Sequence, residues 1–156
     1  MERLDRCLKK IGELPNEPPH KVPIKGKWYT TVATRLEIFR EVFGTEGKIT
    51  QKLITADLER VVMKANVFVY QNDRWEKVAD GFAEEFREAS PVNQNSAVEN
   101  CSTSCIGRAL ANLGLHGSEF ASAFEVQNAM ERKPPAPKSN QFTNQSIPKD
   151  FSSLGS

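Results

Sequence analysis

The chain has 156 residues, of which 38% are hydrophobic and 26% are charged, and its formal net charge is +1. That length suits one domain with a modest core, and no apolar run reaches the roughly 20 residues of a membrane span. A charge this close to neutral excludes nucleic-acid binding by bulk charge alone, so such a role needs local basic clusters.

The N-terminal region predicts a short helix followed by an arm. Residues 2–12 place apolar side chains on one stripe of an amphipathic helix, namely Leu4, Cys7, Leu8 and Ile11. Because a helix this short is not stable alone, we expect it to pack on the domain or on a neighbouring subunit. Residues 14–23, LPNEPPHKVP, contain four prolines, which predicts a linker without regular structure.

The N-terminus and the cysteines indicate the cellular compartment in which the protein is expected. The first ten residues, MERLDRCLKK, lack the apolar core of a signal peptide. The cysteines are odd in number, which indicates free thiols in a reducing environment; they are Cys7, Cys101 and Cys105. We therefore expect a cytoplasmic protein with no membrane partner.

Residues 24–29, IKGKWY, place Lys25 and Lys27 beside Trp28 and Tyr29. Basic residues interleaved with aromatic ones are typical of nucleic-acid binding, because cations meet phosphates and rings stack on bases. A buried Trp28 flanked by solvated lysines explains the same pattern equally well.

The next segment predicts a structural helix that begins at Thr30 or Thr31, runs to Phe43 and stops at Gly44. Its expected buried stripe contains Val32, Leu36, Phe39 and Phe43. Its expected solvated side contains Arg35, Glu37, Arg40 and Glu41.

Three strands are predicted next, and short connections favour an antiparallel meander. The first covers residues 48–58, with a bulge expected near Leu53 and Ile54 where the alternation slips. The second covers residues 60–71 and alternates cleanly between two faces. The third covers residues 75–88, where Gly81 marks a bulge or a close approach. A solvated strand face is the simplest explanation of the acidic residues on the third strand, Asp80, Glu84 and Glu85.

The rest of the chain is organised around a helix predicted from Asn95 to Gly114, with Asn95 or Ser96 as N-cap after a polar loop at 89–95. Its apolar side is expected to be buried and contains Val98, Ser102, Cys105, Ile106, Ala109, Leu110 and Leu113. Its other side is small or polar and contains Ala97, Cys101, Ser104, Arg108, Ala111 and Asn112. A flat surface with one guanidinium suits a phosphate backbone, while a surface helix with one solvated arginine explains it as well.

A further helix is predicted over residues 119–132, with Phe120, Phe124, Val126 and Ala129 expected to be buried. Residues 133–156 are rich in Pro, Ser, Asn and Gln, which predicts a disordered tail. Spaced apolar residues in that tail suggest a docking motif, for example for a replication or recombination protein, although idle hydrophobic residues explain them too.

Signatures of catalysis are absent from the sequence. It has no phosphate-binding loop of the Walker type, no GxSxG and no HExxH. The cysteines and histidines lack the spacing of a zinc site. We expect a protein that is not an enzyme and has no catalytic residue, metal or cofactor.

The stretch SAVENCSTSCIGRALANLGL, followed by ASAFEVQNA, resembles a segment of bacteriophage single-strand annealing proteins of the essential recombination function (ERF) family. The order helix, three strands, helix is also similar to the core of the eukaryotic recombination-mediator annealing proteins, which share the wider superfamily. The similarity covers residues 24–130.

This resemblance implies ATP-independent binding of single-stranded DNA and annealing of complementary strands by a homo-oligomeric ring or filament, in the host cytoplasm if a bacteriophage encodes it. DNA would lie in a basic groove beside the meander, lined by the arginine of the RAL segment. The predicted DNA-binding residues are Arg108, Lys64, Lys52, Lys27, Lys25, Ser96 and Ser104. The alternative function is a single-stranded DNA-binding accessory or interaction protein without annealing activity.

The predicted fold is α+β: a helix, a three-stranded antiparallel meander and a second helix form the core, with an extra N-terminal helix and a disordered C-terminal tail. The predicted divisions are residues 1–23 for the N-terminal helix and arm, 24–132 for the core domain and 133–156 for the tail.

Overall fold

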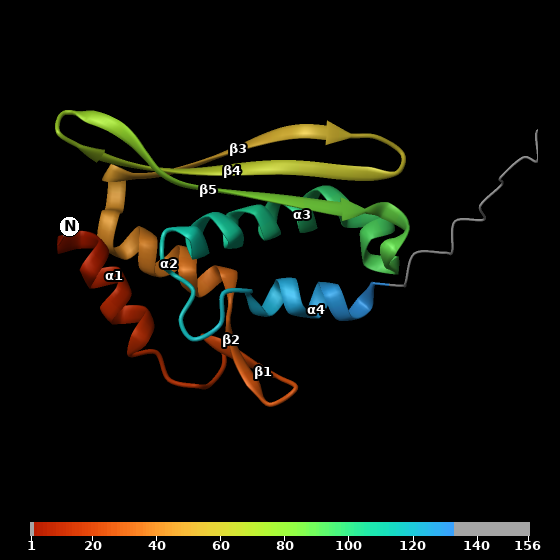
Figure 1. Ribbon diagram of the computed structural model, residues 1–156, viewed down its shortest axis with the longest axis horizontal. Coiled ribbons are helices and arrows are strands. Elements are labelled where there is room, and N and C mark those ends of the chain that lie inside the picture. The colour runs from red at the N-terminus through yellow and green to blue at the C-terminus, as the bar shows by residue number, and fades with distance from the viewer. Residues whose placement is uncertain (1, 133–156) are drawn as a thin grey trace, which may run out of the picture.

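The computed structural model describes residues 2–132 and shows the predicted α+β fold (Figure 1). Two short 3₁₀ turns, Gly44–Glu46 and Arg87–Ala89, join the main elements. These elements are α1 (Glu2–Gly12), β1 (Lys21–Ile24), β2 (Lys27–Thr30), α2 (Val32–Phe43), β3 (Gly47–Ala56), β4 (Arg60–Gln71), β5 (Arg74–Phe86), α3 (Pro91–Asn112) and α4 (Ala123–Glu131). The predicted tail at 133–156 lies outside the described residues, and the predicted domain divisions stay predictions. No helix in the described part is both long and apolar enough to cross a membrane.

Strands β3, β4 and β5 form the predicted antiparallel meander, with β4 in the centre. The alternation along β4 is confirmed, because Val61, Ala65 and Val67 are buried on one face of the sheet. The bulge expected near Leu53 and Ile54 is present, where the β3 register shifts between Leu53 and Thr55. A second bulge lies in β5, where the register skips Val78.

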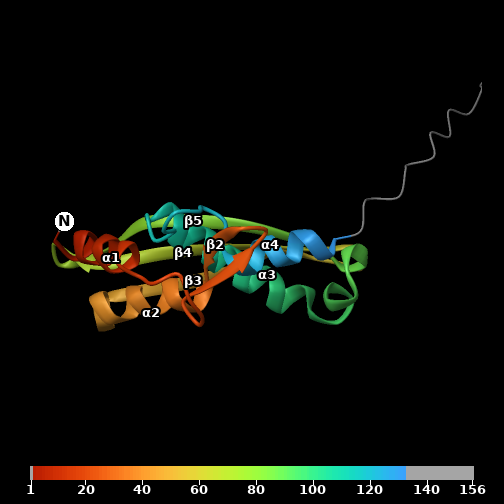
Figure 2. The same ribbon diagram turned by 90° about the horizontal axis from the view of Figure 1, so that it is seen from below.

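All helices of residues 2–132 lie on one side of the three-stranded sheet, and α3 packs directly on β4 and β5 (Figures 1 and 2). The close approach expected at Gly81 is confirmed. A methyl group there would lie 2.4 Å from the backbone nitrogen of Ala109 and 2.8 Å from the carbonyl oxygen of Cys105. Only glycine therefore lets the backbones of β5 and α3 come this close.

Much of the face of α3 that was expected to receive a ligand instead packs in the protein interior, so that prediction is wrong there, although Arg108 and Asn112 on the same face are exposed. Ala97, Cys101 and Ser104 are buried, whereas Val98, expected in the core, is 40% exposed. Small side chains do allow another surface to approach closely, but the partner is the protein's own strand β5 rather than a phosphate backbone.

The start of α3 also differs from the prediction. Residues 91–95 are helical rather than a loop, because Ser90 caps the helix and Pro91 occupies its first turn. Serine followed by proline is a known helix start that takes precedence over the later capping signal. The predicted cap, Ser96, has non-helical backbone angles (φ −130°, ψ 28°) and marks a kink inside the helix.

Helix α2 has the predicted caps, since Thr31 accepts a hydrogen bond from the Thr34 N–H and Gly44 ends the helix. The expectation that Arg35 is solvated is wrong, because this side chain is 0% exposed. Its guanidinium donates to backbone carbonyls of α3 and of the following loop, at 3.1 Å each to Gly107, Phe120 and Ala121. Burial lowers the pKa of Arg35 to about 10.

The N-terminal helix α1 packs on α2, as expected of a helix too short to be stable alone, and buries Cys7 and Ile11. The prediction that residues 14–23 lack regular structure is wrong at their end, where β1 pairs with β2 in a separate two-stranded ribbon. Pro23 lies opposite Trp28 in that ribbon. An edge strand tolerates a proline, which cannot donate a hydrogen bond.

Helix α4 is shorter than predicted because it begins at Ala123, after a capping box between Ser122 and Glu125. The buried residues of this helix are Ala123 and Asn128. Burial of Phe120 and Ala129 was a wrong expectation, since Phe120 is 43% exposed and Ala129 is also exposed. A polar side chain in the buried stripe breaks the apolar period from which the prediction was made.

Candidate nucleic-acid interface

The face of the three-stranded sheet that points away from the helices is uncovered in the described part of the chain (Figure 1). We call it the open sheet face. The strand register arranges its side chains in rows across the strands. These rows are Tyr70–Trp75, Lys48–Phe68–Lys77, Thr50–Asn66–Asp80, Lys52–Lys64–Phe82, Thr55–Val62–Glu84 and Arg60–Phe86.

Several aromatic rings on the open sheet face are exposed to solvent. Phe82 is 55% exposed, Trp75 41% and Tyr70 36%. Lysines lie over two of the rings: the Lys48 ammonium is 4.2 Å from the Trp75 ring centre, and the Lys64 ammonium is 4.7 Å from that of Phe82. Such cation–π contacts fix the positions of both the ammonium groups and the rings at the surface.

The open sheet face is also more basic than the chain as a whole. It carries five basic side chains and only two acidic ones; they are Lys48, Lys52, Arg60, Lys64 and Lys77 against Asp80 and Glu84. Within residues 2–132, Lys52 has no ion-pair partner and lies directly opposite Lys64. Like charges in such a pair repel, and a bound phosphate would relieve that repulsion.

The bulge at Val78 brings Lys77 and Asp80 to the same face, although three residues apart on a regular strand would point them to opposite faces. The carboxylate oxygen Oδ2 of Asp80 lies 3.0 Å from the ammonium groups of both Lys64 and Lys77. Hydrogen bonds from these two lysines lower the pKa of Asp80, which keeps the carboxylate charged.

The predicted DNA-binding residues fall into three separate places. Lys52 and Lys64 lie on the open sheet face. Lys25 and Lys27 lie at the turn of the β1–β2 ribbon, where Lys27 pairs with Glu119 at 3.2 Å. The other three, Ser96, Ser104 and Arg108, lie on α3, on the helical side of the sheet. The structure therefore does not bring the seven residues together.

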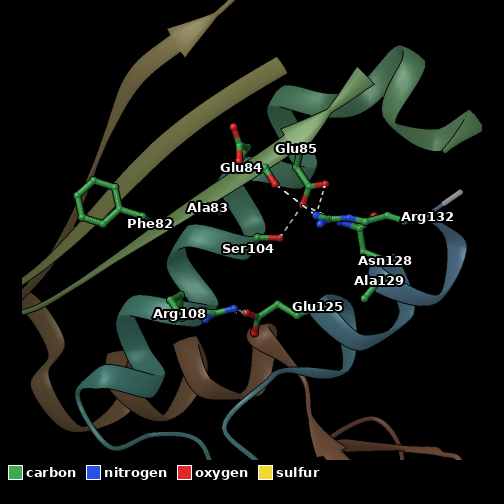
Figure 3. Close-up of a pocket in the computed structure, with 10 residues that line it drawn as sticks. All are labelled: Phe82, Ala83, Glu84, Glu85, Ser104, Arg108, Glu125, Asn128, Ala129 and Arg132. Carbon is green, nitrogen blue, oxygen red and sulfur yellow. Dashed lines mark hydrogen bonds and ion pairs between the residues drawn. The ribbon is translucent and has the colours of Figure 1, made fainter. Parts of the chain in front are cut away.

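Arg108 lies at a pocket of about 270 Å³ between β5, α3 and α4 (Figure 3). Its guanidinium is half exposed and pairs with Glu125 at 2.6 Å. The carboxylates of Glu84 and Glu85 also line the pocket. The basic groove that was expected beside this arginine is therefore not present, because the charged side chains that line this pocket are three carboxylates and two guanidinium groups.

Glu85 forms the buried centre of that pocket, which corrects the expectation of a solvated acidic strand (Figure 3). Its carboxylate accepts hydrogen bonds from Asn128 at 2.6 Å, Asn93 at 2.8 Å and Arg132 at 3.0 Å. The predicted site residue Ser104 also donates to it, at 3.3 Å. These donors satisfy both carboxylate oxygens, so the arrangement joins α3, α4 and β5 as a structural network.

Sequence reasoning missed several residues of the open sheet face, namely Lys48, Phe68, Trp75, Lys77 and Phe82. One signal was available. The outward-facing positions of β4 read Val62, Lys64, Asn66, Phe68 and Tyr70, which is too polar and aromatic for a second buried face. The partners on β5 could be added only once the register was known.

The described residues thus define an α+β domain whose helices cover one face of a meander and leave a basic, aromatic face open. A family model described as Slr1353 N-terminal dsRNA-binding domain-like matches residues 36–113, from within α2 to the end of α3. The chain belongs to this family. No curated protein matches it.

This match overturns the assignment to the ERF annealing family, because the longer of the two stretches that carried that resemblance, residues 96–115, lies inside the matched region up to residue 113. The structure supplies a physical reason for the motif. Its small residues are required where α3 contacts β5 and α2, for example at Gly107, whose Cβ position lies 2.8 Å from the Val32 side chain. The family description points to nucleic-acid binding as the general function.

Proposed function

We propose that this protein binds nucleic acid through the open sheet face and prefers a single strand. The observation that carries the proposal is the alternation of lysines with exposed aromatic rings on one uncovered surface. Ammonium groups attract phosphates, and rings stack on unpaired bases. Bases inside a duplex are already stacked on one another, so exposed rings favour a single strand over a double helix.

The proposal keeps the alternative function expected from the sequence, a binding protein without annealing activity. Annealing and assembly into a ring or filament depended on the ERF resemblance, and they lose their support with it. Under this proposal the protein binds nucleic acid and does not act as an enzyme. The two carboxylates of the open sheet face are both ion-paired, Asp80 with two lysines and Glu84 with Arg60, which suits binding rather than proton transfer.

Fluorescence anisotropy with labelled oligonucleotides of about 12 residues tests the proposal, since one binding surface of this size covers roughly 4–16 nucleotides. Single-stranded and double-stranded RNA and DNA are compared, because the family description names a duplex. We expect the single strands to bind more tightly, with affinity falling as salt rises from about 50 to 200 mM.

Point variants locate the binding surface. Phe82→Ala should weaken binding by about 1–3 kcal/mol through lost stacking. Lys52→Ala should weaken it with little sequence dependence and reduce the salt slope by about one. Lys25→Ala and Arg108→Ala are the matched controls, because they remove a cation from other surfaces of the molecule. Loss of binding in these controls but not in the open-face variants, or tighter binding of duplexes, would refute the proposal.

A further inference from the structure

The middle row of the open sheet face differs from the rows beside it. Thr50, Asn66 and Asp80 lie side by side across the three strands, and each carries a hydrogen-bonding group and no ring. The row on one side contains Phe68, and the row on the other contains Phe82. A polar row between two aromatic rows is an arrangement that can read the edge of a base held between two stacked neighbours.

The spacing of the rows fits an extended strand. Phe68 and the Lys64–Phe82 pair lie four residues apart along β4, which corresponds to about 13 Å. An unstacked strand extends to about twice the 3.4 Å per nucleotide of a duplex. One nucleotide therefore fits over the polar row when its neighbours stack on the two aromatic rows.

Asp80 is held firmly in this row. Its backbone carbonyl accepts a hydrogen bond of 2.5 Å from the Asn112 side chain of α3, which anchors the residue from the helical side of the sheet. On the open side, Lys64 and Lys77 both contact carboxylate oxygen Oδ2. Oxygen Oδ1 makes no hydrogen bond to another group within residues 2–132 and stays available as an acceptor.

We propose that Asp80 is a specificity-determining residue that favours cytosine, and other bases with an edge amino group, over uracil and thymine. The inference rests on the nucleic-acid binding proposed above. An ionised carboxylate only accepts hydrogen bonds, so it pairs with the amino group of cytosine and repels the O4 carbonyl that uracil has in the same place. The neighbouring amide of Asn66 has both a donor and an acceptor and can pair with either base. Asp80 is therefore the residue that discriminates between them.

The test compares oligonucleotides of about 12 cytidines and 12 uridines by anisotropy, in the ribose or deoxyribose form that the wild type binds more tightly. These bases are both pyrimidines of similar stacking area, so a difference between them reports the edge contact. We expect the wild type to prefer cytosine by about tenfold. Asp80→Asn should reduce the preference to within about threefold, since an amide can pair with either base.

Glu84→Gln is the matched control, because it removes the other carboxylate of the same face and releases Arg60. Both substitutions should raise affinity for uridine oligonucleotides by freeing cations for phosphates. Only Asp80→Asn should change the ratio between the two bases. If Asp80→Asn lowers the melting temperature so far that the variant is not folded in the assay, Asp80→Ser replaces it, since a hydroxyl is likewise both donor and acceptor.

The outcomes separate this inference from the proposed function. A wild type that binds both oligonucleotides equally, or a ratio that Asp80→Asn and Asp80→Ser leave unchanged, overturns the role of Asp80 while binding by the open sheet face stands. A wild type that binds neither oligonucleotide overturns both.

Discussion

Gly81→Ala is expected to push α3 away from β5 and so to destabilise the protein. The added methyl group would lie 2.4 Å from the Ala109 nitrogen and 2.8 Å from the Cys105 carbonyl oxygen. These are backbone atoms of a helix, which cannot rotate away as a side chain can. Overpacking of a core costs about 1–3 kcal/mol, and we expect the upper end here because the helix must move as a unit.

A smaller effect acts in the opposite direction. Replacing glycine by alanine restricts the unfolded chain and favours folding by about 0.4–1 kcal/mol where the backbone conformation allows it. The steric cost exceeds this gain, so the net change in the free energy of unfolding should be a loss of about 2 kcal/mol. At roughly 3–5 °C per kcal/mol for a domain of this size, the melting temperature should fall by about 6–10 °C.

Urea unfolding and thermal melting followed by circular dichroism measure this loss. Gly12→Ala is the control, because no atom lies within 4 Å of its Cβ position. It should leave stability unchanged or raise it slightly. The reasoning about the contact between α3 and β5 is wrong if Gly81→Ala melts at or above the wild-type temperature.

Three further predictions concern buried groups. Arg35→Met should lower the free energy of unfolding by about 2–4 kcal/mol in urea titrations, because four backbone carbonyls lose a donor. A loss under about 1 kcal/mol would contradict this. Glu85→Ala should cost about 3–5 kcal/mol by the same assay, whereas Glu84→Ala, which breaks an exposed pair, should cost at most about 1 kcal/mol. Burial raises the pKa of Cys101 from 9.0 to about 11, so the unfolded chain loses the thiol proton first as pH rises. Stability should therefore fall across that pH interval, with a shallower slope in Cys101→Ala, and equal slopes would argue against the buried thiol as the cause.

Elements whose signals are local could be predicted from the sequence. Helix α2 carries its own start at Thr31 and its own stop at Gly44, and both are where they were expected. Strand β4 alternates over its whole length, so its inner face was identified without knowledge of its neighbours. Gly81 was expected to mark a bulge or a close approach because a glycine inside a strand needs such a reason.

Features that depend on distant partners could not be predicted. Periodicity divided α3 into two faces, but which face meets the sheet is decided by how β5 and α2 pack around it. Arg35 looked solvated because its acceptors are backbone carbonyls more than 70 residues away, which no side-chain pattern records. Small residues needed for packing were also mistaken for the signature of another family.

In the candidate site, too, some residues could be predicted from local signals and others depend on distant partners. Lys52 and Lys64 were selected as single basic residues, and both lie on the open sheet face. Phe82 and Trp75 join them only through the pairing of β4 with β5, and Asp80 reaches Lys77 only through the bulge at Val78. A linear pattern names the candidates on one strand, while the surface exists only after three strands are aligned.

The position of Trp75 gives the protein a built-in optical probe. The chain has two tryptophans, and the other, Trp28, lies in the ribbon of β1 and β2, away from the row that contains Tyr70 and Trp75. A single Trp28→Phe exchange would leave one indole that emits from beneath the Lys48 ammonium. Quenching or a spectral shift of that emission would then report occupancy of the sheet in real time, without a dye on either partner.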